Sequence, residues 1–129
     1  MAIKFKPDFA LAHYNLGIAL VAEGKNEEAI SHYKMAIEIK PSHAEAHYNL
    51  GNTLRREGKN SEAISHYKMA IKVKPDFADA YNNLGAVLFN ANITEEAIGY
   101  LKEAIRIRPD FIDAQKNLKV AISKLEKGP

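Results

Sequence analysis

The chain of 129 residues contains no cysteine and no tryptophan, and its positive and negative charges nearly cancel. Without cysteine it can form no disulfide bond and no thiolate metal site, and it has no cysteine nucleophile. A cytoplasmic location is the natural expectation for such a chain. The 18 Lys and Arg residues stand against 16 Asp and Glu, which gives a net charge of +2. The electrostatic field of so small a net charge does not favour nucleic acid as a partner.

Long apolar runs are also missing from the sequence. No stretch approaches the roughly 20 apolar residues of a membrane-spanning helix, and residues 1–6 lack the apolar core of a signal peptide. With 47% hydrophobic and 26% charged residues, the composition is that of an ordinary soluble domain. We therefore expect a folded, soluble chain without a membrane partner.

Proline is scarce, but four of the five prolines recur with a period of 34 residues. They are Pro7, Pro41, Pro75 and Pro109. A Leu-Gly pair recurs with the same period, at residues 16–17, 50–51 and 84–85. A fixed period of this length indicates an array of helical hairpins, in which each hairpin buries its apolar face against the next.

The period divides the chain into three whole repeats with an incomplete segment at each end. The segments are the end of an upstream repeat over 1–9, the repeats 10–43, 44–77 and 78–111, and a C-terminal capping helix over 112–129. Because the sequence begins inside a repeat, we interpret it as a single domain taken from a longer array.

Each repeat contains two stretches with apolar residues at the spacing of an amphipathic helix. In the second repeat, Leu50 lies on the first stretch and Tyr67 on the second. Ser42 begins a Ser-x-x-Glu capping box, which predicts the start of the first helix, and Asp76 and Asp110 hold the same position in later repeats. The proline before each of these caps is expected to end the preceding second helix.

Small residues mark the turns and the contacts between the helices. Gly24 and Gly58 predict a tight turn between the two helices, because glycine accepts a positive φ, and the third repeat has Asn92 in their place. A second set of glycines is expected to let the two helices of a hairpin approach closely. These are Gly17, Gly51 and Gly85.

The Leu-Gly pair, the aromatic residues, the alanines and the proline at set places resemble the signature of the tetratricopeptide family. The resemblance covers nearly the whole chain, although His13, His47 and Tyr81 stand where the family often has tryptophan. It implies an all-α fold, a right-handed solenoid or superhelix of antiparallel helical hairpins. It also implies a scaffold for protein binding, in which the first helix of each hairpin lines a concave groove.

Groove positions can be read from the first helices on this basis. The candidate peptide-binding residues are Tyr14, Asn15, Ile18, Tyr48, Asn49, Asn52, Arg55, Asn82, Asn83, Phe89 and Asn117. An asparagine precedes the leucine once in every repeat, and its amide can both donate to and accept from a peptide backbone. This pattern is similar to the tetratricopeptide superhelix of O-GlcNAc transferases, where such asparagines hold the substrate backbone. The alternative is that the asparagine bonds to a neighbouring repeat.

Other ligands are disfavoured by particular residues. The clamp for a terminal carboxylate found in chaperone-binding members needs cations, but Tyr14 and Asp79 occupy two of those positions. His43 and His47 have a spacing that can bind metal on a helix, but no third ligand is evident, so we predict no metal site. No catalytic grouping or phosphate-binding loop recurs. We therefore predict a chain that is not an enzyme and needs no cofactor.

The sequence thus predicts a non-catalytic scaffold that binds a peptide segment of a partner protein in its groove. Two alternatives stay open. The chain could be the substrate-recognition arm of a larger enzyme such as a glycosyltransferase. It could also associate with itself through exposed terminal faces, because Phe5, Phe9 and Leu11 lie near the start of the first repeat.

Overall fold

The computed structural model describes the backbone of residues 2–128 and the side chains of residues 9–128. This part of the chain folds into seven helices and contains no strand, as the sequence predicts. The helices are α1 (Ala2–Ala22), α2 (Asn26–Ile39), α3 (Ala44–Arg56), α4 (Asn60–Val73), α5 (Ala78–Asn90), α6 (Thr94–Ile107) and α7 (Ile112–Lys127). They form two compact units, Met1–Val73 with α1 to α4 and Lys74–Pro129 with α5 to α7.

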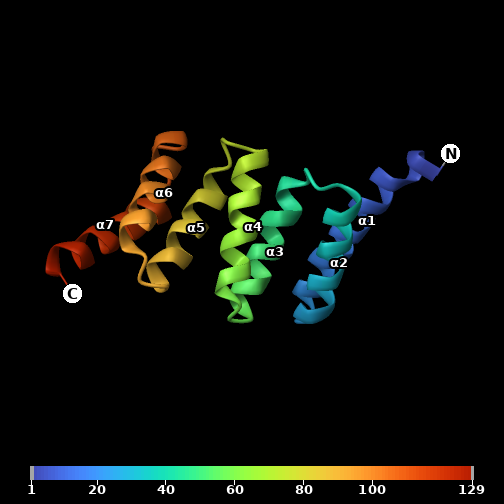
Figure 1. Ribbon diagram of the computed structural model, residues 1–129, viewed down its shortest axis with the longest axis horizontal. Helices are drawn as coiled ribbons and strands as arrows, with labels where there is room; N and C mark the ends of the chain where they lie inside the picture. The colour runs from blue at the N-terminus through green and yellow to red at the C-terminus, as the bar shows by residue number, and fades with distance from the viewer. Residues whose placement is uncertain (1, 129) are drawn as a thin grey trace. The chain divides into compact units, whose positions relative to one another are not determined.

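Unit 1 consists of two antiparallel helical hairpins. Helix α1 packs along α2 and α3 packs along α4, and the two hairpins meet where α2 and α1 contact α3 (Figure 1). Each hairpin is closed by a short turn, at residues 23–25 and 57–59. The sequence prediction of a helical hairpin in each repeat is therefore confirmed here.

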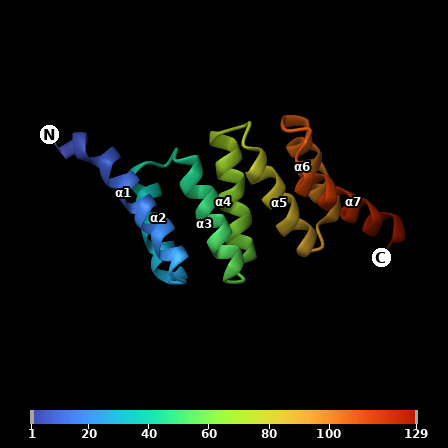
Figure 2. The same cartoon turned by 180° about the vertical axis from the view of Figure 1, so that it is seen from behind.

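Unit 2 contains one hairpin and the last helix. Helix α5 packs along α6, and α7 contacts both of them (Figure 2). Among the described residues, no helix is long and apolar enough to cross a membrane.

The turn inside each hairpin has the same backbone conformation. Gly24 and Gly58 have φ angles of 79° and 80°, and Asn92 takes the same place with a φ of 66°. After the first helix, the Lys25 N–H donates to the Leu20 carbonyl at 2.8 Å, a bond typical of a Schellman motif. Asparagine tolerates this left-handed region better than most residues, so the third turn closes without glycine.

The predicted caps of the first helices are one residue too early. The N-cap of α3 is His43, whose Nδ1 accepts a hydrogen bond from the Ala46 N–H at 3.3 Å, and not Ser42. Phe77 holds the N-cap position of α5 without a side-chain hydrogen bond, where Asp76 was expected. Ser42 belongs instead to the turn before the helix, since the His43 N–H donates to the Lys40 carbonyl at 3.1 Å. Proline fits the second position of such a turn.

The same correction applies to the cap of the last helix. Phe111 and not Asp110 precedes α7, again without a side-chain hydrogen bond to the helix. The N–H of Phe111 donates to the Arg108 carbonyl at 3.0 Å, so Asp110 lies within the turn. The pattern of a proline followed by a capping residue therefore predicts a helix start that is one residue too early, because the turn includes both residues.

The backbone around Pro7 also differs from the prediction. Helix α1 is continuous over Ala2–Ala22, so Pro7 does not end a helix there. Pro7 is the sixth residue of this helix, so it removes the hydrogen bond that its own nitrogen would donate four residues back, and the helix continues past it. The assignment of residues 1–9 to an upstream repeat stays a prediction.

The contact of a glycine with a large side chain sets the distance between the helices of each hairpin. A Cβ added at Gly51 of α3 would lie 2.8 Å from the ring of Tyr67 on α4, and one added at Gly17 would lie 2.6 Å from Tyr33. In the third hairpin Gly85 faces Leu101 in the same way, at 2.6 Å. Because these large partners are almost fully buried, they have no room to move away.

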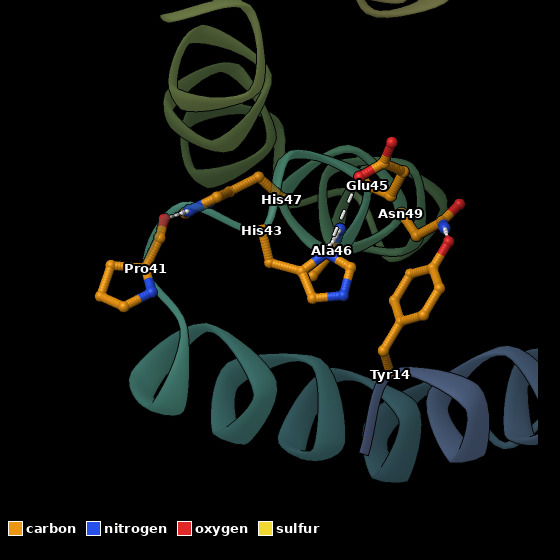
Figure 3. Close-up of polar contacts among 7 residues, drawn as sticks. All are labelled: Tyr14, Pro41, His43, Glu45, Ala46, His47 and Asn49. Carbon is orange, nitrogen blue, oxygen red and sulfur yellow. Dashed lines mark hydrogen bonds and ion pairs between the residues drawn. The ribbon is translucent and has the colours of Figure 1, made fainter. Parts of the chain in front are cut away.

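Histidine pairs join the same helices in unit 1. The Nδ1 atoms of His13 and His32 lie 3.0 Å apart, as do those of His47 and His66. The Nε2 of His47 also lies 3.0 Å from the Pro41 carbonyl oxygen, to which it donates (Figure 3). His47 therefore carries its proton on Nε2, accepts at Nδ1 and receives a hydrogen bond from Nδ1 of His66. The sequence did not predict these histidine pairs.

The environment of the second pair favours neutral rings. Burial lowers the pKa of His47, and hydrogen bonding to the Pro41 carbonyl opposes this effect. Burial and the nearby His47 and Lys34 lower the pKa of His66 to about 4, while Glu62 raises it. A proton added at Nδ1 of His47 would place two donors face to face and break the bond between the rings.

Adding a methyl group at Gly51 tests the close packing. Gly51→Ala is expected to lower the free energy of unfolding by about 1–3 kcal/mol, because the buried Tyr67 ring cannot give way. Gly99→Ala is the matched control, since Gly99 is exposed on α6 with nothing within 4 Å of its added Cβ. The free energy of unfolding of this control variant should rise by up to about 1 kcal/mol, because alanine has a higher helix propensity than glycine. Urea denaturation followed by circular dichroism measures both, and equal effects would contradict the packing argument.

Acid should weaken unit 1 through the second histidine pair. Since the folded pKa values lie below the unfolded value, the unfolded chain binds more protons between about pH 6.5 and 4. Stability is therefore full above that window and falls as the pH drops through it, by about 2 kcal/mol between pH 7 and 5.

The third repeat supplies the control for this pH effect. Tyr81 and Tyr100 replace the histidines there, with ring centroids 6.1 Å apart. The double variant His47→Tyr and His66→Tyr copies this pair, and its stability should fall less between pH 7 and 5. Thermal unfolding at the two pH values measures the difference. Equal losses in the wild type and the variant would count against a role for the pair.

Candidate functional site

The candidate residues of unit 1 come from α1 and α3, which contact each other. Tyr14 and Asn49 are directly bonded, because the Asn49 side-chain N–H donates to the Tyr14 hydroxyl oxygen at 2.9 Å (Figure 3). The ring of Tyr14 packs beside that of His43, with 4.7 Å between the ring centroids. The first and second repeats therefore share this part of the candidate site, at the junction of their first helices.

Burial of Tyr14 has an electrostatic consequence. Burial and the nearby Glu45 carboxylate raise the pKa of the Tyr14 phenol, against the hydrogen bond from Asn49, which lowers it. The phenol therefore stays protonated at neutral pH. Its O–H group can donate a further hydrogen bond while its oxygen accepts from Asn49.

The remaining candidates of unit 1 differ in exposure. Asn15 and Ile18 of α1 are exposed, and Ile18 keeps 43% of its surface. Tyr48 and Arg55 of α3 are half-buried. Asn52 is also half-buried, and its side-chain oxygen accepts a hydrogen bond from the Tyr67 hydroxyl at 2.5 Å.

Unit 2 places its candidates on α5 and α7. The Asn117 side-chain N–H donates to the Asn82 side-chain oxygen at 3.0 Å, and the Asn82 N–H approaches Asn83 at 3.5 Å. Asn82 keeps only 7% of its surface, so its side chain serves the contact between these helices. This burial does not agree with the prediction that Asn82 faces a ligand. Asn83, Asn117 and Phe89 are half-buried and reach the surface.

Repeated asparagines bond to a residue of the preceding repeat. Asn49 bonds to Tyr14 and Asn117 bonds to Asn82, and both pairs are separated by 35 residues. These bonds correspond to the alternative in which the repeated asparagine bonds to a neighbouring repeat. Each bond uses one donor of the amide, whereas an amide has two donors and an oxygen that accepts up to two hydrogen bonds. The bond to the neighbouring repeat and a bond to a peptide are therefore compatible.

The two residues considered for metal binding have other roles. His43 caps α3 through Nδ1, and His47 bonds to the Pro41 carbonyl (Figure 3). His47 also bonds to His66. Within the described part of the chain, no group of three or more His, Cys, Asp or Glu side chains is placed to hold a metal ion.

The position of Asp79 also bears on the ligand. Its carboxylate oxygen lies 2.6 Å from the Arg108 guanidinium, which in turn stacks on Phe111 at 3.9 Å from the ring centroid. Asp79 is thus an anion with a partner on the same unit. A carboxylate clamp that needs a cation at this position is not supported by such an arrangement.

Several known proteins resemble the chain in structure. The first tetratricopeptide domain of Spaghetti (RPAP3), solved bound to an HSP90 peptide, matches with a TM-score of 0.90 at 23% identity, covering 93% of this chain and 95% of that one. The tetratricopeptide domain of Sgt2 from Aspergillus fumigatus matches with a TM-score of 0.85 at 20% identity, covering 92% and 80%. Both matches confirm the predicted all-α fold of helical hairpins.

A third structure has higher sequence identity. YrrB, described as a tetratricopeptide protein with an unusual peptide-binding site, matches with a TM-score of 0.80 at 30% identity, covering 85% of this chain and 57% of that one. Among curated protein sequences, none matches the chain.

The family models account for most of the repeats. Residues 19–56 and 51–92 match the model described as TPR repeat, and residues 78–111 match the model described as tetratricopeptide repeat. The matched residues span more than half of the chain, from the end of α1 through α6. The chain therefore belongs to the tetratricopeptide repeat family.

Proposed function

We propose that the chain binds an extended peptide segment of another protein along the first helices of its hairpins, without catalysing a reaction. The observation that carries the proposal is the asparagine that recurs once per repeat on these helices. Asn15 is exposed, and Asn49 is half-buried. Each such amide can donate to and accept from the backbone of a peptide.

The neighbouring side chains support binding of this kind. Ile18 is exposed and Tyr48 is half-buried, so both offer apolar surface beside the amides. The phenol of Tyr14 offers a donor next to Asn49. The structures of Spaghetti (RPAP3) and YrrB show that members of this family use related folds for peptides. A site of this composition recognises a peptide mainly through the peptide backbone and to a lesser extent through the peptide side chains.

The finer resemblance to O-GlcNAc transferases belongs to this proposal as well. It rests on the Asn-Leu-Gly sequence in each repeat, at residues 15–17, 49–51 and 83–85. A chain of this kind could serve as the recognition arm of a larger enzyme, and the same asparagines would then hold the substrate backbone. A catalytic domain joined to these repeats in the full-length sequence would support that form of the proposal.

Removing the amides tests the proposal. The double variant Asn49→Ala and Asn83→Ala is expected to bind peptides at least tenfold more weakly on a peptide array, since each lost hydrogen bond costs about 0.5–1.5 kcal/mol. Its fold is checked by thermal unfolding. Unchanged binding by the folded variant would reject the proposal.

A matched control separates the two roles of Asn49. Tyr14→Phe removes the hydrogen bond between the repeats and the phenol's own donor but keeps the Asn49 amide, so it should cost about 1 kcal/mol of stability and weaken peptide binding less than the double variant does. If Tyr14→Phe weakens binding as much as the double variant does, the asparagine acts through packing and not through the peptide.

Self-association is a second candidate function, favoured by apolar side chains on the first helix. Phe9 and Leu11 of α1 are 56% and 53% exposed, and Leu16 is 44% exposed. Such a surface on a tetratricopeptide hairpin can stack on another hairpin. Light scattering over a concentration series should then show a mass that rises with concentration and a rise that is lost in Leu11→Gln. A constant monomer mass would remove this candidate.

A further inference from the structure

The C-terminal part of unit 2 contains an open hollow of about 630 Å³ that the sequence analysis did not predict. It lies between α5 and α7. Its main lining residues are Phe89, Lys119, Val120, Ser123, Lys124 and Lys127. Only Phe89 among them is a candidate of the peptide-binding face, so the other five residues extend that face along α7.

The floor of the hollow is apolar and held in place. Val120 keeps 54% of its surface, and the half-buried ring of Phe89 lies beside it in the lining. The Lys124 ammonium lies 4.9 Å from the centre of the Phe89 ring and donates to the side-chain oxygen of Asn92. These two contacts fix Lys124 along one wall. An aliphatic side chain of a ligand would bury apolar surface on this floor.

The rim of the hollow is positively charged. Three of its lining residues are lysines, and no Asp or Glu is among the residues that line it. Lys119 and Lys127 are exposed, and neither takes part in an ion pair described in this part of the chain. Ligand carboxylates can therefore approach both lysines without displacing an internal partner.

The spacing of the lysines matches one arrangement of ligand charges. Lys119 and Lys127 are eight residues apart on α7, which corresponds to about 12 Å along a helix with a 1.5 Å rise. In an extended peptide, residues i, i+2 and i+4 point to the same side, and i and i+4 lie about 13 Å apart. Two acidic residues at i and i+4 can thus meet the two lysines while residue i+2 faces the apolar floor.

We propose that this hollow binds an extended acidic peptide segment of the form acid-x-aliphatic-x-acid, with two side-chain carboxylates at the lysines and the aliphatic side chain on Phe89 and Val120. The inference rests on the proposed function, because it assigns a ligand class to one end of the same peptide-binding face. Side-chain carboxylates at i and i+4 are favoured, since their spacing of about 13 Å matches the roughly 12 Å between the two lysine backbone positions.

The peptide Gly-Glu-Ala-Leu-Ala-Glu-Gly, labelled with fluorescein and amidated at its C-terminus, is the probe for fluorescence anisotropy with the whole chain. Replacing both Glu by Gln should weaken binding about fivefold at low salt, and the difference should shrink as salt is added. Replacing Leu by Ser should weaken binding about tenfold. Equal binding of the Glu and Gln peptides would overturn the proposal.

Variants of the chain locate the effect. Lys119→Gln with Lys127→Gln should abolish the preference for the Glu peptide, and Val120→Ser should reduce the preference for Leu over Ser. Lys102→Gln is the matched control, because Lys102 is exposed on α6 and does not line the hollow. A preference that persists in the double lysine variant would place the peptide elsewhere and overturn the proposal.

The outcome also separates this inference from the proposed function. Peptides found on the array that bind through Asn49 and Asn83, without any preference for the acidic probe, would overturn only the hollow as a site. If neither the array nor the probe series yields binding, both proposals fail. Binding of the acidic probe that depends on the two lysines but not on the asparagines supports the hollow alone.

Discussion

The close contact between a glycine on one helix and a large buried side chain on the next is the constraint on which each hairpin depends. The rings of Tyr33 and Tyr67 occupy the space that a Cβ at Gly17 or Gly51 would need. This contact sets the distance between the two helices and fixes their rotation. The opposite side of the first helix is thereby turned outward. The position of the repeated asparagine is a consequence of that rotation.

Under the proposed function, the repeated asparagine combines a structural and a binding role at the same side chain. Asn49 holds Tyr14 of the preceding repeat, and Asn117 holds Asn82 in unit 2 by a bond of the same kind. Such bonds orient the amide, because one of its donors is fixed. An amide that is oriented in advance loses less entropy when it binds a peptide. The bond from the asparagine to a neighbouring repeat is thus a reason why this side chain is suited to binding a peptide.

The period of 34 residues predicted the hairpins, the buried contacts of Gly17 and Gly51, and the turn at Gly24, because each depends on residues close in sequence. The start of α3 was misplaced, since the turn after Pro41 takes up Ser42 and leaves His43 as the cap. The burial of Asn82, the histidine pairs and the hollow on α7 were not predicted. They depend on side chains of different helices, whose rotation and packing a repeat pattern does not specify.

The central claim is that the chain reads the backbone of a peptide through amides on its first helices. The most direct test is to take one peptide that binds and methylate its backbone nitrogens one at a time, leaving every side chain unchanged. The account predicts that methylation of particular backbone nitrogens weakens binding by about two- to tenfold each, because each removes a donor that an asparagine oxygen accepts. Affinity that is unaffected by methylation at every position but lost on changing side chains would contradict it.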